Sequence, residues 1–265
     1  MEIAGYVASI LIGISLGLIG GGGSILTVPV LAYLFHIDPI QATSYSLFIV
    51  GVTSMVGSVS YFKKGLVNTK TAVVFGIPSI LAVFLTRAYL IPSIPDNIIS
   101  IEKLTITKSV LLMLIFAILM IFASYSMIKK EKIRPETTPQ KQKFNYPLIF
   151  IEGTIVGTLT GLVGAGGGFL IIPALVLLSK LPMKEAIGTS LVIIAAKSLI
   201  GFWGERGESS VNWPFLFLVS AFAIIGIFIG IALSKKINGE KLKPAFGWFV
   251  LVMGIYIIVK ETLLK

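Results

Sequence analysis

Long apolar stretches, separated by short polar ones, run along almost the whole chain. Ten of them can be delimited, at residues 3–20, 24–36, 41–61, 71–91, 105–128, 147–163, 167–180, 186–203, 214–234 and 244–264. Eight have 17 residues or more, which is the length that an α-helix needs to cross about 30 Å of hydrocarbon. The pattern therefore predicts an all-α integral membrane protein with about 8–10 membrane segments.

The composition agrees with a chain that lies mostly in the bilayer. Hydrophobic residues make up 55% of the sequence and charged residues only 13%, whereas a soluble domain carries about 25% charged residues. The formal net charge is +10, but the basic residues lie mainly in short loops, where they set the orientation of a membrane protein. The chain has no cysteine, which excludes disulfides and thiolate metal sites. No cofactor, no metal and no nucleic-acid partner are expected.

An internal repeat becomes visible when the chain is shifted by 144 residues. Residues 17–68 then align without a gap with residues 161–212, and 17 of these 52 positions are identical. The identities include glycine, proline, serine and asparagine, which an apolar bias alone does not bring into one register. We therefore predict two homologous halves, residues 1–128 and 147–265, joined by a basic linker at 129–146.

The charges of the loops indicate how the halves are related. The basic linker and the segment KKINGEKLK (235–243) are both expected in the cytoplasm, so an even number of crossings lies between them. The loop FKKGLVNTK (62–70) is then cytoplasmic and its repeat equivalent GERGESSVN (204–212) external, which makes the repeat inverted. In the alternative arrangement each half has four spans and the repeat is parallel, but 235–243 then faces outward against the charge bias.

Two glycine-rich stretches, GLIGGGGSILTVP (17–29) and GLVGAGGGFLIIP (161–173), interrupt the apolar pattern. Each glycine costs a helix about 1 kcal/mol relative to alanine, and irregular backbone at membrane depth must be buried or line a cavity. The segments that follow are too short to span alone. We predict a helix, a glycine break and a half-helix in each half, with the first N–H groups of each half-helix facing an anion. Close helix packing is the alternative, and it is the favoured explanation for the ladders Ser9–Gly13–Gly17 and Gly153–Gly157–Gly161.

At these residues the chain resembles the sulfite exporter TauE/SafE family of membrane permeases. The resemblance lies in GLIGGGGSILTVPVL (17–31), ATSYSL (42–47), GLVGAGGGFLIIPAL (161–175) and AIGTSL (186–191), and it extends over essentially the whole chain. It implies transport of sulfite, sulfonates or other sulfur-containing or organic anions across the cytoplasmic membrane of a prokaryote. It implies a permease more firmly than it implies sulfite.

The residues predicted to bind the substrate lie at the two glycine breaks, in the Ser/Thr-containing stretches and at one lysine: Gly20, Gly21, Gly22, Gly23, Ser24, Ser46, Gly164, Gly166, Gly167, Gly168, Ser190 and Lys197. Ser46 and Ser190 are repeat equivalents whose hydroxyls can donate to an oxyanion. The alternative for both is a hydrogen bond to their own helix. Lys197 has apolar sequence on both sides, which favours a cation that faces a cavity over one that reaches the membrane rim.

Glu152 is the only carboxylate well inside an apolar segment. Three roles fit it: an ion pair with Lys197, proton coupling, or a place at the cytoplasmic interface. Arg87 and His36 stand near segment ends and are expected at the membrane interface.

These observations predict a secondary permease for a small anion, most consistent with sulfite or an organosulfonate, that works by alternating access around the two glycine breaks. The chain has no ATP-binding motif, so a gradient would drive transport. An anion channel of the same architecture is the alternative. An enzyme is not expected, because the chain has one histidine, no cysteine and no carboxylate pair inside the segments. The expected partners are the anion and the lipid bilayer, with a homo-oligomer left open.

Overall fold

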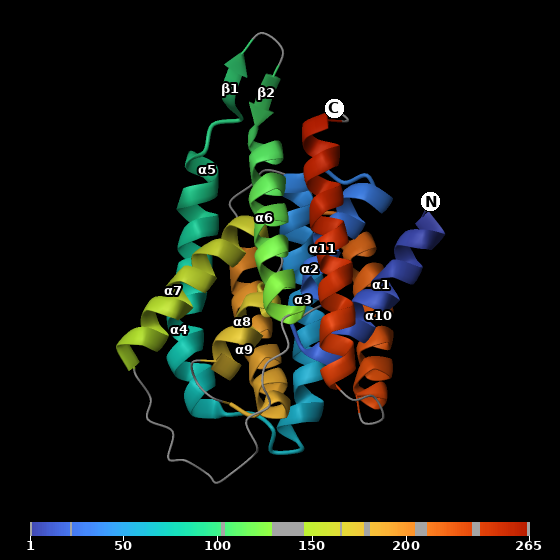
Figure 1. Ribbon diagram of the computed structural model, residues 1–265, viewed down its shortest axis with the longest axis vertical. Helices are drawn as coiled ribbons and strands as arrows, with labels where there is room; N and C mark the ends of the chain where they lie inside the picture. The colour runs from blue at the N-terminus through green and yellow to red at the C-terminus, as the bar shows by residue number, and fades with distance from the viewer. Residues whose placement is uncertain are drawn as a thin grey trace.

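The computed structural model describes residues 2–21, 23–101, 104–128, 146–164, 166–177, 181–204, 211–234 and 239–263, and the chain forms a bundle of helices (Figure 1). The first part contains α1 (Glu2–Ile19), α2 (Ser24–Pro29), the π-helical turn η1 (Val30–Leu34), α3 (Pro39–Phe62), α4 (Thr69–Leu85), the π-helical turn η2 (Thr86–Leu90), α5 (Ile91–Ser93), strands β1 (Asn97–Ile101) and β2 (Leu104–Thr107), and α6 (Lys108–Ile128). The second part contains α7 (Tyr146–Val163), α8 (Gly168–Leu177), α9 (Met183–Trp203), α10 (Trp213–Leu233) and α11 (Gly239–Leu263).

The helices of the two parts begin in the same register. α7, α8, α9 and α10 each begin 144 residues after α1, α2, α3 and α4 (residue 146 against 2, 168 against 24, 183 against 39, and 213 against 69). Asn68 and Asn212 cap α4 and α10 in the same way, since each side chain accepts a hydrogen bond from the N–H three residues on, at 3.0 and 3.2 Å. Such a cap satisfies one of the N–H groups that a helix start leaves unpaired. The interval of 144 residues therefore describes the helix boundaries as well as the sequence.

Within the described residues, five helices are long and apolar enough to cross a membrane: Pro39–Phe62, Thr69–Ser93, Lys108–Tyr125, Met183–Trp203 and Trp213–Leu233. Three apolar helices are shorter: Ile3–Ile19, Ser24–Leu34 and Pro147–Val163. Large apolar side chains such as Phe122 and Phe217 are exposed on the outer surface, where hydrocarbon is a suitable solvent for them. The predicted fold class, a helical integral membrane protein, is confirmed.

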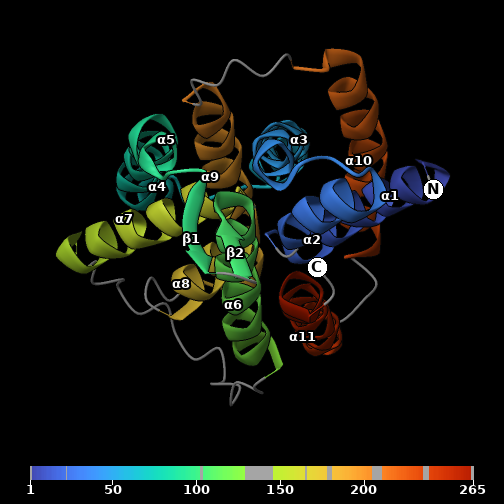
Figure 2. The same cartoon turned by 90° about the horizontal axis from the view of Figure 1, so that it is seen from above.

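The centre of the bundle is formed by α3 and α9, which lie side by side (Figure 2). The two helices run antiparallel. Near the start of α3, a Cβ added to Gly201 would lie 3.5 Å from Cδ1 of Leu47. Near the end of α3, a Cβ added to Gly188 would lie 3.0 Å from Cβ of Tyr61. The residue numbers rise on one helix while they fall on the other, so the two repeat-equivalent helices point in opposite directions.

Two further pairs cross between the halves, α1 with α10 and α4 with α7. Both pairs run parallel and meet through small residues. Gly13 packs against the backbone of Ala223, and its repeat equivalent Gly157 packs against Ser79, where an added Cβ would lie 2.5 Å from the Ser79 carbonyl oxygen. Ala223 and Ser79 are themselves 144 residues apart, so the second contact repeats the first. The prediction that these glycine ladders serve close packing is confirmed.

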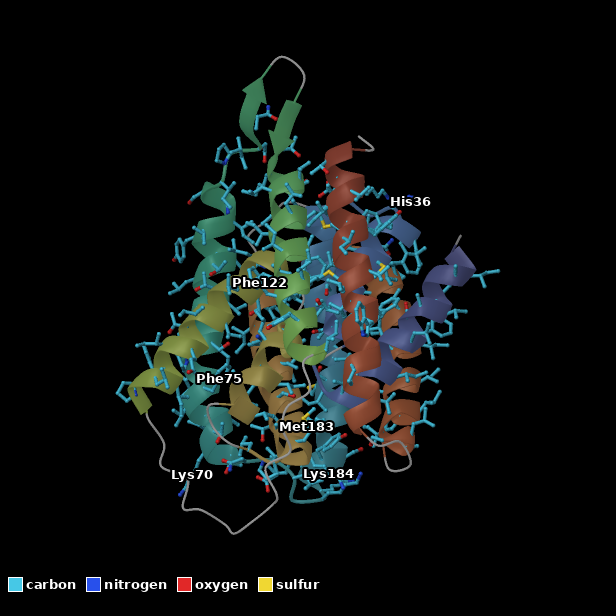
Figure 3. All side chains as sticks on the ribbon, in the orientation of Figure 1. His36, Lys70, Phe75, Phe122, Met183 and Lys184 are labelled. Carbon is cyan, nitrogen blue, oxygen red and sulfur yellow. The ribbon has the colours of Figure 1, made fainter. Side chains whose placement is uncertain are left out.

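The ends of the helices confirm the opposite directions of α3 and α9. Lys184, in the first turn of α9, lies at the lower end of the bundle together with Lys70, in the first turn of α4 (Figure 3). His36, which shortly precedes α3, lies near the upper end (Figure 3). His36 is exposed, in keeping with the position expected for it near a membrane interface.

One element was not expected from the sequence. Residues before α6 form an antiparallel hairpin in which Ser100 pairs with Thr105 and Ile101 with Leu104, and it projects from the upper end of the bundle (Figure 1). The stretch IISI and LTIT is rich in β-branched residues, which favour strands. α6 accordingly begins at Lys108 rather than at residue 105.

Candidate functional site

The first glycine break lies between α1 and α2. Gly20 has a left-handed backbone conformation with φ of 82°, which glycine adopts without the steric penalty of other residues, and its N–H donates to Leu16 O at 2.8 Å. A Cβ added to Gly20 would lie 3.1 Å from the Ser190 hydroxyl oxygen. Gly23 packs back against α1, and the Ser24 hydroxyl donates to Gly21 O at 2.7 Å. Gly22, also predicted for the site, lies outside the described residues.

The second break lies between α7 and α8 and contains more left-handed backbone. Gly164, Gly166 and Gly167 have φ values of 71°, 62° and 65°. The N–H of Gly164 donates to Thr160 O at 2.9 Å, which is the repeat equivalent of the bond from Gly20 to Leu16. α8 then begins at Gly168, and the N–H groups of Leu170 and Ile171 in its first turn both donate to Gly167 O, at 3.0 and 3.1 Å. The positive end of α8 therefore faces the break.

The two breaks meet inside the protein. Gly21 and Gly168 are in direct backbone contact, and a Cβ on either residue would collide with the main chain of the other. All described glycines of both breaks are buried. Two stretches that are 144 residues apart in the chain are thus brought into one buried region.

Lys197 from α9 lies beside the second break. Its side chain is 1% exposed, and its ammonium group donates a hydrogen bond to the Thr160 hydroxyl at 3.0 Å. A Cβ added to Gly167 would lie 2.6 Å from Lys197 Nζ. The alternative in which this lysine reaches the membrane rim is wrong, because the side chain points into the bundle toward the break.

The expectation that Arg87 lies at the membrane interface is wrong. The residue is 0% exposed, and its Nη1 donates to the Thr43 hydroxyl at 3.1 Å. A Cβ added to Gly164 would lie 2.5 Å from Arg87 Nη2. The position near the end of an apolar segment suggested a rim residue, but α4 continues through η2 and α5, which places Arg87 within the bundle.

The two serines predicted for the site, Ser190 and Ser46, differ in their hydrogen bonds. Ser190 donates to its own helix at Ile187 O, 2.8 Å away, as the alternative explanation expected, while also lying next to Gly20. Ser46 is buried, and its hydroxyl has no hydrogen-bond partner among the described residues. It lies one turn along α3 from Thr43, on the same face.

Ser198 was not among the residues predicted for the site from the sequence. Its hydroxyl is buried, has no hydrogen-bond partner in the part of the chain that the structure describes, and lies 3.1 Å from a Cβ added to Gly166. The available signal was its position next to Lys197 and its identity with the repeat equivalent Ser54.

Glu152 is partly buried in α7 and does not pair with Lys197. It precedes Thr160, the hydrogen-bond partner of Lys197, by eight residues, or about 12 Å along the helix axis. A role for Glu152 in coupling stays a prediction. Among the described residues, no group of three or more His, Cys, Asp or Glu side chains could hold a metal ion.

The second break thus combines left-handed glycines, the start of a helix, two buried cationic side chains and an unbonded hydroxyl. A helix start carries a partial positive charge, and it favours anions. A buried cation is costly in a membrane unless it faces a counter-charge or a polar cavity. The chemistry of this arrangement suits a negatively charged ligand.

The helical fold, with its apolar helices of membrane-spanning length, is that of a multi-pass membrane protein. A profile of the family described as "Sulfite exporter TauE/SafE" matches residues 6–257, and the chain belongs to that family. The chain is 29% identical to a probable membrane transporter protein of Xylella fastidiosa (strain Temecula1), over 94% of this chain and 91% of the relative.

Two other relatives cover similar lengths. The probable membrane transporter protein YunE of Bacillus subtilis is 27% identical, over 97% of this chain and 94% of the relative. The probable membrane transporter protein MJ0441 of Methanocaldococcus jannaschii is also 27% identical, over 96% and 94%. No solved structure matches the chain.

Proposed function

We propose that this protein is a secondary permease that carries a small anion, sulfite or an organosulfonate, across the cell membrane by alternating access. The observation that carries the proposal is the buried contact between the two glycine breaks, at Gly21 and Gly168, with Lys197 beside it. Irregular backbone at this depth is tolerated where it is buried in protein or lines a polar cavity. The positive end of α8 and the ammonium group of Lys197 at that place can replace the interactions that an anion loses when it leaves water.

The arrangement of the helices supports an inverted repeat. The repeat-equivalent helices α3 and α9 run antiparallel, and the pair α1–α10 is repeated by the pair α7–α4. A two-fold axis that relates two antiparallel helices is perpendicular to both of them. If the helices span a membrane, this axis therefore lies in the membrane plane. Inverted repeats of this kind permit alternating access, because exchanging the conformations of the two halves turns an outward-facing state into an inward-facing one.

The charged residues support an orientation with the lower end in Figure 3 in the cytoplasm. Lys70 and Lys184 lie at that end, and Lys63 and Lys64 follow directly on the end of α3. Short basic loops are retained in the cytoplasm. The cytoplasmic position of the basic linker at 129–146, which lies largely outside the described residues, stays a prediction from its charge.

The test is counterflow of radiolabelled sulfite, and separately of a labelled sulfonate, in vesicles reconstituted with the purified full-length protein. We expect the unmodified protein to exchange external label for internal unlabelled anion, and both Gly21→Leu and Lys197→Ala to abolish the exchange. Gly65→Asn is the matched control, since Gly65 also has a positive φ of 66° but open space around it. Flux that does not saturate and shows no exchange would favour the channel, and unchanged exchange in both variants would contradict a site at the breaks.

A further inference from the structure

The two glycine breaks have related backbones but different charges around them. Arg87 approaches Gly164 and Lys197 approaches Gly167, at opposite ends of the second break. Their repeat equivalents are Ile231 and Thr53, 144 residues away in each direction, and neither carries a charge. Both cationic side chains are essentially inaccessible to solvent, at 0% and 1% exposed.

A third group points into the same break independently of these charges. The Ser198 hydroxyl is fully buried and lies 3.1 Å from a Cβ added to Gly166, between the two cationic ends of the break. No protein atom forms a hydrogen bond with it in the described part of the chain. A buried polar group without a partner is costly unless a ligand or water satisfies it.

α8 adds a fourth element. It has 10 residues and begins at Gly168, at the end of the break, so its positive end and its first N–H groups face the same region. The corresponding α2 has 6 residues and continues as a π-helical turn. The helix start is thus present in both halves, since Ser24–Leu34 forms one helical segment, and the first break differs in having neutral groups next to its described glycines.

We infer that the anion binds at the second break only, held by Arg87 and Lys197 from its two ends and by Ser198 between them, while the first break serves as a neutral packing partner. The inference rests on the proposed function and refines it, because it assigns the charge of the site to one half of the repeat and adds Arg87 and Ser198 to it. The planar guanidinium group of arginine can donate to two oxygens of one ligand, whereas the lysine ammonium acts as a compact point charge. Together with the serine hydroxyl, these donors suit the three-oxygen head that free sulfite and sulfonates share.

The experiment compares repeat-equivalent substitutions in the purified full-length protein. Binding of sodium sulfite and of sodium methanesulfonate is measured by calorimetry in detergent, and transport is measured in vesicles. The second-break variants are Arg87→Gln, Lys197→Met and Ser198→Ala. The matched variants of the first half, called first-break variants because of their place in the repeat, are Thr53→Val and Ser54→Ala. They change buried hydroxyls at the repeat equivalents of Lys197 and Ser198.

We expect each second-break variant of a charged residue to bind the anion at least about tenfold more weakly, since a hydrogen bond to a charged group contributes about 1.5–3 kcal/mol. Ser198→Ala should weaken binding less, and the two first-break variants should bind as the unmodified protein does. The midpoint of thermal unfolding without anion separates loss of the site from loss of the fold. Lys197→Met should keep or raise that midpoint, because an uncompensated charge is replaced by an apolar side chain.

If Arg87→Gln does not fold, Arg87→Lys and Ser198→Ala together test whether the anion binds at the second break. Arg87→Lys keeps the positive charge but removes the planar guanidinium group. Equal weakening by the matched first-break and second-break variants, or normal binding in all second-break variants, would overturn the inference and leave the proposed function standing. If the unmodified protein transports neither sulfite nor methanesulfonate, the proposed function fails first. A response to sulfite alone identifies the free ion as the ligand, and a response to both identifies the shared head group.

Discussion

The groups nearest to the described glycines of the first break are neutral, with Ile172, Ile187 and the Ser190 hydroxyl next to Gly20. The second has Arg87 at one end and Lys197 at the other. The backbones agree where each break begins, since the bond from Gly20 to Leu16 is repeated by the bond from Gly164 to Thr160. They differ where each break ends, since Gly23 has a φ of −69° and its repeat equivalent Gly167 a φ of 65°. The comparison teaches that duplication supplied a glycine break twice, while side chains from other helices gave the two copies different electrostatic surroundings.

The largest effect is expected from a side chain placed at equivalent positions of the two breaks. Gly167→Ala should cost about 1–2 kcal/mol for the left-handed conformation and about 1–3 kcal/mol more for overpacking against Thr160 and Lys197. Gly23→Ala should cost only the overpacking, which here is against the α1 backbone at Ile12 O and Leu16 N, because Gly23 has a φ of −69°. Unfolding in detergent, followed by circular dichroism, compares them, and equal losses would show that the second break is not the more strained one.

The next effect concerns the hydrogen bond that holds Lys197. Thr160→Val removes its acceptor and should cost about 1–3 kcal/mol, since a buried donor loses its partner. Thr53→Val is the matched control, because Thr53 is the repeat equivalent of Lys197 and its buried hydroxyl has no partner in the described chain, so its removal should not destabilise. Thr160→Ser should restore stability. Thermal unfolding checks all three, and a loss in Thr53→Val as large as in Thr160→Val would remove the asymmetry.

A third prediction covers helix pairs in which the two halves should behave alike. Gly13→Ala in α1 and Gly157→Ala in α7 should each destabilise by about 1–3 kcal/mol, because both place a methyl group against the backbone of a partner helix. The measurement is again unfolding in detergent. A loss confined to one of the two variants would mean that the pairs α1–α10 and α4–α7 are not equivalent.

The smallest expected effect concerns the helix starts. Asn68→Ala and Asn212→Ala each remove one capping hydrogen bond and should cost about 1 kcal/mol. The double variant should lose the sum of both, because the two caps belong to different helices. Thermal unfolding of the single and double variants tests this, and clearly unequal single losses would argue against equivalent helix starts.

Much of the fold was predictable from local sequence. The apolar segments near 41–61, 71–91, 186–203 and 214–234 correspond to α3, α4, α9 and α10, because the length and hydropathy of a segment are properties of that segment alone. The site was predictable only in part. Lys197 stands out as a charge in an apolar segment, whereas Arg87 could not be distinguished from a rim residue and Ser198 could not be distinguished from other helix serines.

The sequence by itself determined that this is a helical membrane protein built from a unit repeated after 144 residues, with a glycine break in each copy. Composition and spacing carry that information, because every segment that crosses the membrane must be apolar and long enough to span the hydrocarbon core. Only the tertiary structure decided that Gly21 meets Gly168, that α3 and α9 run antiparallel, and that both cationic groups lie at the second break. Those facts depend on which helices pack together, and packing joins residues such as Arg87 and Gly164 that no local pattern connects.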